Sequence, residues 1–118
     1  MTVQECYAAM GGNYDEVVGR LRTDERVQKF LMLFLKDTSF SDLENGIRSG
    51  NVEEAFRAAH TLKGICGNLS LTKLLALAEE LTEALRGKAA IGADVPPLFQ
   101  TAKETYGVIM QAIRSLAQ

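Results

Sequence analysis

The stretch "AFRAAHTLKGICGNLSL" spans Ala55 to Leu71 and holds the only histidine of the chain, His60. Two glycines, Gly64 and Gly67, follow within seven residues, although the segment has the pattern of a long helix. Each glycine inside a helix costs about 1 kcal/mol relative to alanine, which is a large amount for a small protein. The sequence therefore predicts that these glycines serve something other than helix formation.

A helical wheel separates the apolar residues of this helix from His60. The helix is expected to begin at Val52, because Asn51 is a good N-cap and Glu54 follows three residues later, as in a capping box. Positions spaced by three and four form one stripe that should face the core: Val52, Ala55, Ala59, Leu62, Cys66 and Leu69. His60 lies about 130° from the centre of that stripe, so we expect its imidazole at the surface or at the rim.

The outer face of the same helix carries the candidate functional residues. The positions that share it with His60 are Glu53, Phe56, Arg57, Lys63, Gly64 and Gly67. Because the glycines have no side chain, another protein would be able to approach the imidazole closely. Lys63 adds a cation that suits an anion attached to His60. The pattern indicates a nucleophilic imidazole that receives a phosphoryl group from a docking protein.

The rest of the chain also has helical periodicity, and no stretch alternates as a strand does. Helices are expected at residues 3–10, at 14–21, from Glu25 to Gly50 with Thr38 or Ser39 as the point of interruption, at 52–69, from Ser70 or Thr72 to Gly87, and from Asp94 nearly to Gln118. The segment "KAAIGADVPP" is the expected long loop. Short connections predict an all-α fold: an antiparallel up-down four-helix bundle covered by one or two short N-terminal helices, forming one domain over residues 1–118.

Composition excludes several function classes. The net charge is −2 and the charges are interleaved, which argues against a nucleic-acid or membrane partner. The longest apolar run, "FLMLFL", is too short to span a bilayer, and the start has no signal-peptide pattern, so we expect a cytoplasmic protein. Cys6 and Cys66 are expected to be reduced thiols, and with one histidine we expect no metal site and no cofactor.

The motif "AHTLKGICGNL" resembles the signature of histidine-containing phosphotransfer (HPt) domains, in which His is followed by x-x-Lys-Gly and a small residue three positions later. Gly50-Asn51 upstream is also similar to the family, and the resemblance covers essentially the whole chain. It implies a four-helix bundle whose second long helix carries the histidine. One departure is Ser70, because many members have glycine ten residues after the histidine. We expect a shifted turn there and no loss of activity.

The resemblance implies a role for each matching position. His60 would be the phosphorylation site, Lys63 would stabilise the phosphoryl charge, and Gly64 and Gly67 would give a receiver domain room to dock. From the wheel alone, Glu53, Phe56 and Arg57 are further docking residues. The implied partners are receiver domains of response regulators or hybrid histidine kinases, and the implied state is a monomer. Since no nucleotide-binding motif is present, we expect a phosphocarrier that is not itself an enzyme.

Two alternatives stay open at the level of sequence. The chain is either free-standing or the phosphoacceptor domain of a larger chemotaxis-type histidine kinase, and the start at Met1 with a complete bundle favours the former. A helical scaffold without transfer activity is the other alternative. Substitution of His60 separates it from a carrier, because a scaffold would lose nothing.

Overall fold

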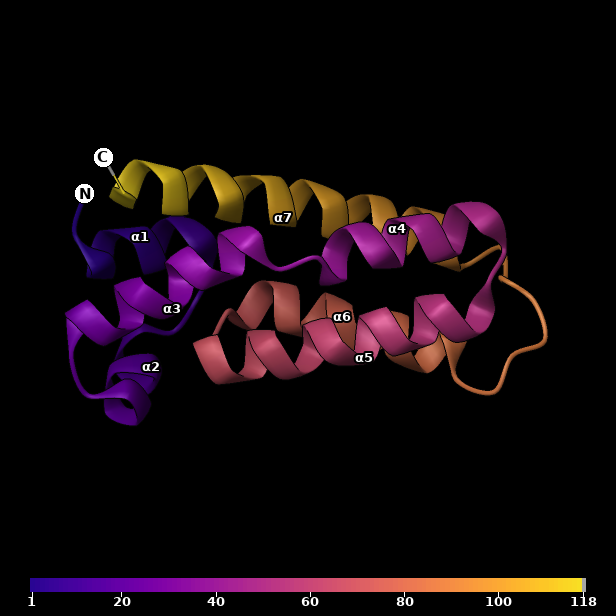
Figure 1. Ribbon diagram of the computed structural model, residues 1–118, viewed down its shortest axis with the longest axis horizontal. Coiled ribbons are helices and arrows are strands. Elements are labelled where there is room, and N and C mark those ends of the chain that lie inside the picture. The colour runs from indigo at the N-terminus through magenta and orange to yellow at the C-terminus, as the bar shows by residue number, and fades with distance from the viewer. Residues whose placement is uncertain (118) are drawn as a thin grey trace.

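The computed structural model describes residues 1–117, and within them every regular element is a helix (Figure 1). In chain order the helices are α1 (Val3–Met10), α2 (Tyr14–Leu21), α3 (Asp24–Lys36), α4 (Ser39–Ser49), α5 (Val52–Leu69), α6 (Thr72–Leu85) and α7 (Val95–Ala117). The predicted all-α class is confirmed. In the described part of the chain, none of the helices combines the length and the apolar character needed to cross a membrane.

Helices α4, α5, α6 and α7 form an antiparallel up-down bundle (Figure 1). Helices α1, α2 and α3 lie together at the end of the molecule opposite the turn between α4 and α5. Short turns join α4 to α5 and α5 to α6, so successive helices run in opposite directions. The 23 residues of α7 correspond to about 35 Å of helix, which is most of the 43 Å length of the molecule. The C-terminal half of α7 is therefore left for α1 and α3 to pack against.

The long segment before α5 is broken at Asp37 and Thr38. Asp37 has extended backbone (φ −69°, ψ 139°), and its carboxylate accepts a hydrogen bond of 2.9 Å from the N–H of Ser39. The predicted interruption is confirmed, with Thr38 as the N-cap of α4. On either side of the break, Phe34 packs edge-on against Tyr106 at 6.0 Å and Phe40 stacks on the same ring at 4.0 Å. The break thus lets both helices pack against α7.

Helix boundaries follow the caps with small differences from the sequence prediction. Asn51 accepts the N–H of Glu54 at 3.1 Å, which is half of a capping box, whereas the complete box lies at Thr2 and Glu5. Helix α6 begins at Thr72 and ends at Leu85, just before Gly87. Helix α7 begins at Val95, one residue after the predicted start at Asp94, so only the last residues of the expected loop stretch are helical. Pro96 and Pro97 are compatible with the first turn of a helix.

Helices α4 and α5 approach each other closely at Gly46. A Cβ atom added to Gly46 of α4 would lie 2.7 Å from the backbone nitrogen of Ala55 and 2.9 Å from its Cα. Ala55 and Ala59 are fully buried on the facing side of α5. The two backbones therefore pack with no side chain between them at Gly46, and this contact sets which face of α5 is turned outward.

The C-terminal end of α5 is held by residues of the N-terminal helices, which we call the N-terminal clasp: Tyr7, Asn13 and Arg20. The Tyr7 hydroxyl donates to the Leu69 carbonyl at 2.7 Å, and Arg20 Nη1 donates to the Asn68 carbonyl at 2.7 Å. The N–H of Asn13 donates to the Ser70 carbonyl at 2.9 Å. Because the last carbonyls of a helix have no partner within it, the clasp satisfies groups that would otherwise need water.

Ser70 ends α5 in the left-handed conformation, with φ 54° and ψ 41°. Its N–H donates to the Gly67 carbonyl and the N–H of Leu71 to the Cys66 carbonyl, which is the Schellman pattern that glycine usually closes. The Ser70 hydroxyl donates to Glu16 at 2.6 Å and accepts from Arg20 at 3.0 Å. These hydrogen bonds hold the serine itself in the conformation that glycine favours. That the turn is shifted relative to sequences with glycine at this position stays a prediction.

Candidate functional site

His60 lies on the exposed face of α5, as the helical wheel predicted. Of the predicted apolar stripe, Ala55, Ala59, Leu62, Cys66 and Leu69 are buried, and Val52 at the first turn is half-buried. The buried stripe fixes the rotation of the helix in the bundle. The imidazole is consequently presented to solvent from a rigid element.

The two glycines beside His60 are not required by the packing of the chain. A Cβ atom added to Gly64 or to Gly67 would meet no atom within 4 Å. The prediction that the bundle does not need them is confirmed. They leave a bare strip of helix surface next to the imidazole, over which a second protein is able to make close contact.

Two shallow hollows meet at His60, and together they collect every candidate residue named from the sequence. The hollow toward the start of α5 is lined by Glu53, Phe56, Arg57, His60, Thr61 and Arg86. The hollow toward its end is lined by His60, Lys63, Gly64, Gly67, Asn68, Leu75 and Glu79. The second helix of the site is thus α6, which contributes Leu75, Glu79 and, at its C-cap, Arg86.

Arg86 is a site residue that the sequence analysis missed. Its guanidinium lies 5.1 Å from the centre of the Phe56 ring, a cation–π distance, and the Phe56 ring is 6.1 Å from the His60 ring with a tilt of 33°. Arg86 also donates to Glu83 at 2.7 Å. The wheel of α5 carries no information on α6, so only the packing of the two helices brings this cation to the site.

Charges around His60 are mixed. Arg57 pairs with Glu53 at 2.8 Å along the exposed face of α5. The hydrogen bond from Arg86 holds the pKa of Glu83 below its ordinary value, and the positive charges of Arg86 and Lys63 act in the same direction. Lys63 of α5 lines the hollow that contains His60, and Arg86 lines the hollow on the other side of His60. A group with negative charge on the imidazole would therefore meet cations from both helices.

The cysteines do not offer a competing nucleophile. Both are buried and free. Burial raises the pKa of Cys66 to about 12 and that of Cys6 to about 11, so both thiols stay protonated near neutral pH. Cys6 lies 3.8 Å from the sulfur of Met10 and packs in the core. Neither thiol therefore lies at the surface that carries His60.

A family comparison agrees with this geometry. The model of the Hpt domain matches residues 33–117, more than two thirds of the chain, from the end of α3 through α7. A search of curated proteins and a search of solved structures found no match to the chain. Hpt domains are phosphocarrier modules that serve histidine phosphotransfer in phosphorelays and interact with receiver domains. With a helical bundle that presents His60 at its surface and a family match over most of its length, this chain belongs to the Hpt domain family.

Proposed function

We propose that His60 accepts a phosphoryl group from the phosphoaspartate of one receiver domain and passes it to the aspartate of another. The observation that carries the proposal is the exposed imidazole beside two glycines that leave open space on the helix surface. Internal packing gives no reason for those glycines, whereas a docking protein that must bring phosphorus to the imidazole does.

The proposed reaction is a direct displacement at phosphorus. Nε2 of the neutral imidazole attacks in line, the bond between phosphorus and the aspartate oxygen breaks, and the carboxylate leaves. Phosphohistidine and the acyl phosphate are both high-energy species, so the step runs in either direction. The bundle supplies position and a nucleophile, and the receiver supplies most of the charge stabilisation.

Each neighbouring residue has a proposed part. Lys63 stabilises the charge on the phosphoryl group, and Gly64 and Gly67 admit the receiver. Glu53, Phe56 and Arg57 form the docking surface on the other side of His60. Arg86 acts through Phe56: the cation holds the aromatic ring, and the ring limits the positions of the imidazole.

The proposed role does not include a kinase reaction. The sequence lacks the glycine-rich loop that holds nucleotide phosphates, and in residues 1–117 no strand is present to precede such a loop. We expect no label on the protein after incubation with labelled ATP alone. Labelling under that condition would contradict this part of the proposal.

A transfer assay tests the function. A panel of purified receiver domains is charged with labelled acetyl phosphate, and each is mixed with the wild-type protein or with His60→Gln. We expect the label to move to the wild-type protein only, to be lost in acid and to survive in alkali. Circular dichroism of His60→Gln provides the folding control, because an exposed histidine contributes little to stability.

The opposite result has a clear meaning. If no receiver transfers label to the folded wild-type protein, the carrier proposal fails and a helical scaffold is the better description. If His60→Gln is labelled as strongly as the wild type, another residue is the acceptor and the assigned role of His60 is wrong.

A further inference from the structure

A carboxylate of α6, that of Glu83, is bonded to a cation of the site although it lines neither hollow at His60. Its Oε2 accepts a hydrogen bond of 2.7 Å from Nε of Arg86, three residues later in the chain. Arg86 lines the hollow that contains Phe56 and His60. Glu83 is therefore one contact away from the surface that carries the imidazole.

A series of contacts connects Glu83 to the imidazole. The Arg86 guanidinium lies 5.1 Å from the centre of the Phe56 ring, and that ring lies 6.1 Å from the ring of His60. Arg86 follows the last residue of α6, where its backbone is extended (φ −62°, ψ 121°). The guanidinium thus contacts both a carboxylate and the aromatic ring next to the imidazole.

The same carboxylate is influenced by the cation in the second hollow. Lys63 lines the hollow toward the end of α5, and at three residues from His60 it is a neighbour of the imidazole on the helix surface. The pKa of Glu83 is lowered first by the hydrogen bond from Arg86, then by the charge of Arg86 and by that of Lys63. Glu83 therefore attracts one cation from each hollow.

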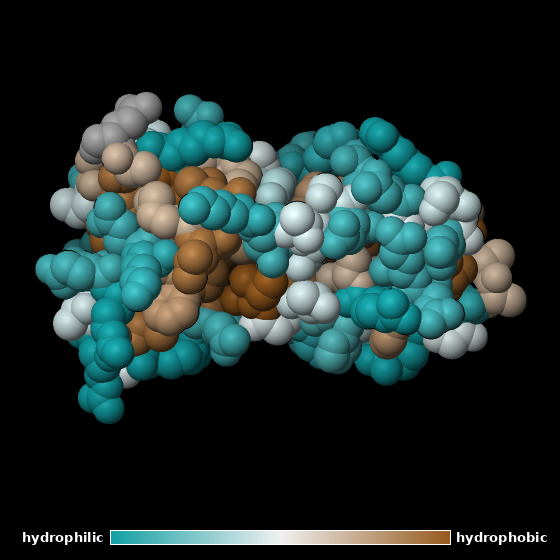
Figure 2. Space-filling view, viewed as in Figure 1, coloured by the Kyte–Doolittle hydropathy of each residue, from teal (hydrophilic) through white to brown (hydrophobic). Residues whose placement is uncertain are grey.

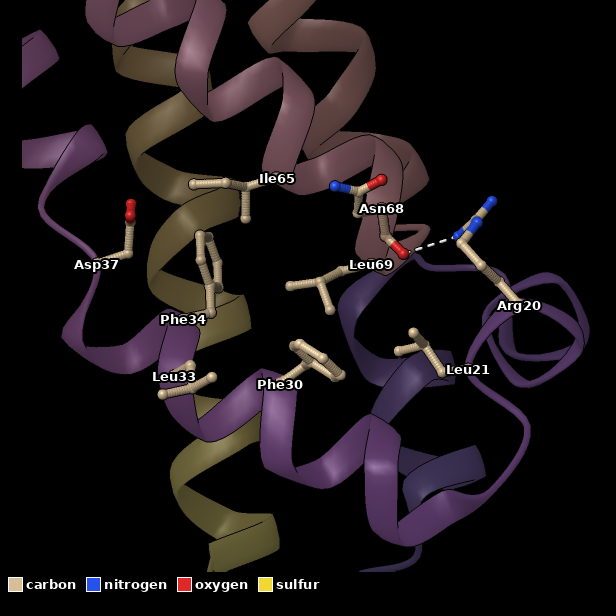
Figure 3. Close-up of a pocket in the computed structure, with 9 residues that line it drawn as sticks. All are labelled: Arg20, Leu21, Phe30, Leu33, Phe34, Asp37, Ile65, Asn68 and Leu69. Atoms are coloured by element: carbon tan, nitrogen blue, oxygen red, sulfur yellow. Dashed lines mark hydrogen bonds between the residues drawn. The ribbon is translucent and has the colours of Figure 1, made fainter.

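The arginine at the other end of α5 differs from Arg86 in what it binds. Arg20 donates to the Asn68 carbonyl at 2.7 Å and to the Ser70 hydroxyl at 3.0 Å. Figure 3 shows this side chain joined to Asn68 at the rim of an apolar hollow between α3 and α5. Arg20 thus holds the end of the helix, whereas the partner of Arg86 is an exposed side chain that can rotate away. Of the two, Arg86 is the cation that can exchange its partner for a phosphoryl group.

We propose that Glu83 sets the transfer equilibrium of His60 by competing with the phosphoryl group for Arg86 and Lys63. The inference rests on the proposed function and adds to it a residue that tunes the site. Transfer forms the bond between phosphorus and Nε2, breaks the bond between phosphorus and the aspartate oxygen, and brings about two negative charges to the ring. Because Glu83 attracts the same cations, the phosphoryl group is held less tightly and passes on to a second receiver more readily.

The exposure of these charges limits the size of the effect. Figure 2 shows that the surface over α4 and the start of α5 is largely hydrophilic, and the side chains of Glu83 and Arg86 are both exposed. Exposed ion pairs contribute little, and salt screens charges over about 8 Å at physiological ionic strength. We therefore expect removal of the charge to change the equilibrium constant about threefold at low salt and less at high salt.

The test compares Glu83→Gln with the wild type, using a receiver domain that charges the wild type in the assay above. Glutamine keeps the size of the side chain and an oxygen that accepts from Arg86, so only the charge is removed. Single-turnover rate constants are measured from the charged receiver to the protein and from the isolated phosphorylated protein back to the receiver. Their ratio should rise about threefold in Glu83→Gln at low salt, and the difference should shrink in high salt. Glu104→Gln is the matched control, since it removes an exposed carboxylate from α7, which lines neither hollow.

A second measurement needs no receiver. The protein is phosphorylated chemically with phosphoramidate, and the phosphoryl group is titrated by phosphorus NMR. Its pKa should be lower in Glu83→Gln than in the wild type, because a neighbouring negative charge is gone. Glu104→Gln should leave it unchanged.

Other outcomes overturn the inference in distinguishable ways. An unchanged ratio with both rate constants lowered would mean that Glu83 only positions Arg86. An equal rise in Glu104→Gln would assign the effect to the net charge of the protein. If no receiver charges the wild type, the proposed function fails and the equilibrium proposal with it. The NMR titration then still decides whether Glu83 acts on a phosphoryl group at His60.

Discussion

Gly46 on α4 and the pair Gly64 and Gly67 on α5 are glycines within helices, yet they face opposite surroundings. A Cβ on Gly46 would come within 2.7 Å of the backbone of Ala55, whereas a Cβ on Gly64 or Gly67 would meet nothing within 4 Å. Each costs its helix about 1 kcal/mol relative to alanine. Gly46 recovers that cost inside the molecule through close packing of α4 on α5, and the other two do not.

The difference shows what a helical glycine is able to reveal. A glycine that lies against a neighbouring helix is required by the packing of the fold. A glycine that has no neighbour in the chain either serves contact with another molecule or has no packing role. We call a glycine open when an added Cβ would meet no atom within 4 Å, and Gly19 and Gly107 are also open. An open glycine alone therefore indicates no site. What sets Gly64 and Gly67 apart is the exposed histidine beside them.

The largest expected effect comes from adding a side chain at Gly46, which we call the closed glycine because α5 lies directly against it. Gly46→Val should lower the free energy of unfolding by about 3 kcal/mol, because its side chain collides with backbone that cannot rotate away. Urea denaturation followed by circular dichroism measures it. Gly107→Val is the matched control, since it adds the same side chain to a helix in open space. Equal stabilities of the two variants would remove the distinction between closed and open glycines.

Filling an open glycine should instead affect the reaction. Gly64→Leu places a bulky side chain where a receiver would sit, so transfer to His60 should fall about a hundredfold through loss of alignment. The free energy of unfolding should not decrease, because nothing in the chain is displaced. Gly107→Leu on α7 controls for the leucine itself. Transfer by Gly64→Leu at the wild-type rate would show that the receiver does not approach over this strip.

A small substitution at the open glycines should stabilise the fold. Gly64→Ala combined with Gly67→Ala is expected to raise the free energy of unfolding by about 2 kcal/mol, since each alanine reduces the backbone entropy lost on folding. Denaturant titration of the double variant against the wild type checks the sign. A decrease in stability would mean that internal packing requires these glycines after all.

The smallest effect concerns a position where a left-handed turn favours glycine but serine is present. The hydrogen bond from Ser70, and after it the contact with Arg20, lowers the pKa of Glu16. A lowered folded pKa means that this stabilisation is present at neutral pH and is lost as the pH falls through the folded pKa. The melting temperature of Ser70→Ala should therefore be lower than that of the wild type at pH 7, and the difference between the two melting temperatures should be smaller near pH 3. A difference that does not change with pH would exclude Glu16 as the cause.

The sequence predicted the local features of this protein. Asn13, Thr23 and Asn51 each cap a helix through the side chain, as residues of their type do. The spacing of apolar residues gave the buried face of α5 and, by exclusion, the exposure of His60. Both are properties of a helix of about five turns, and the period of 3.6 residues relates all of its positions to one another.

Contacts between helices were decided by the tertiary structure. No spacing within α5 indicates that Arg86 of α6 lies over Phe56, or that Arg20 of α2 reaches the carbonyl of Asn68. The conformation of Ser70 was likewise not predictable from the sequence, because hydrogen bonds with α2 hold it in a turn that its residue type disfavours. The wheel describes the rotation of one helix, whereas the surroundings of His60 depend on how several helices are placed, which only packing of the whole chain determines.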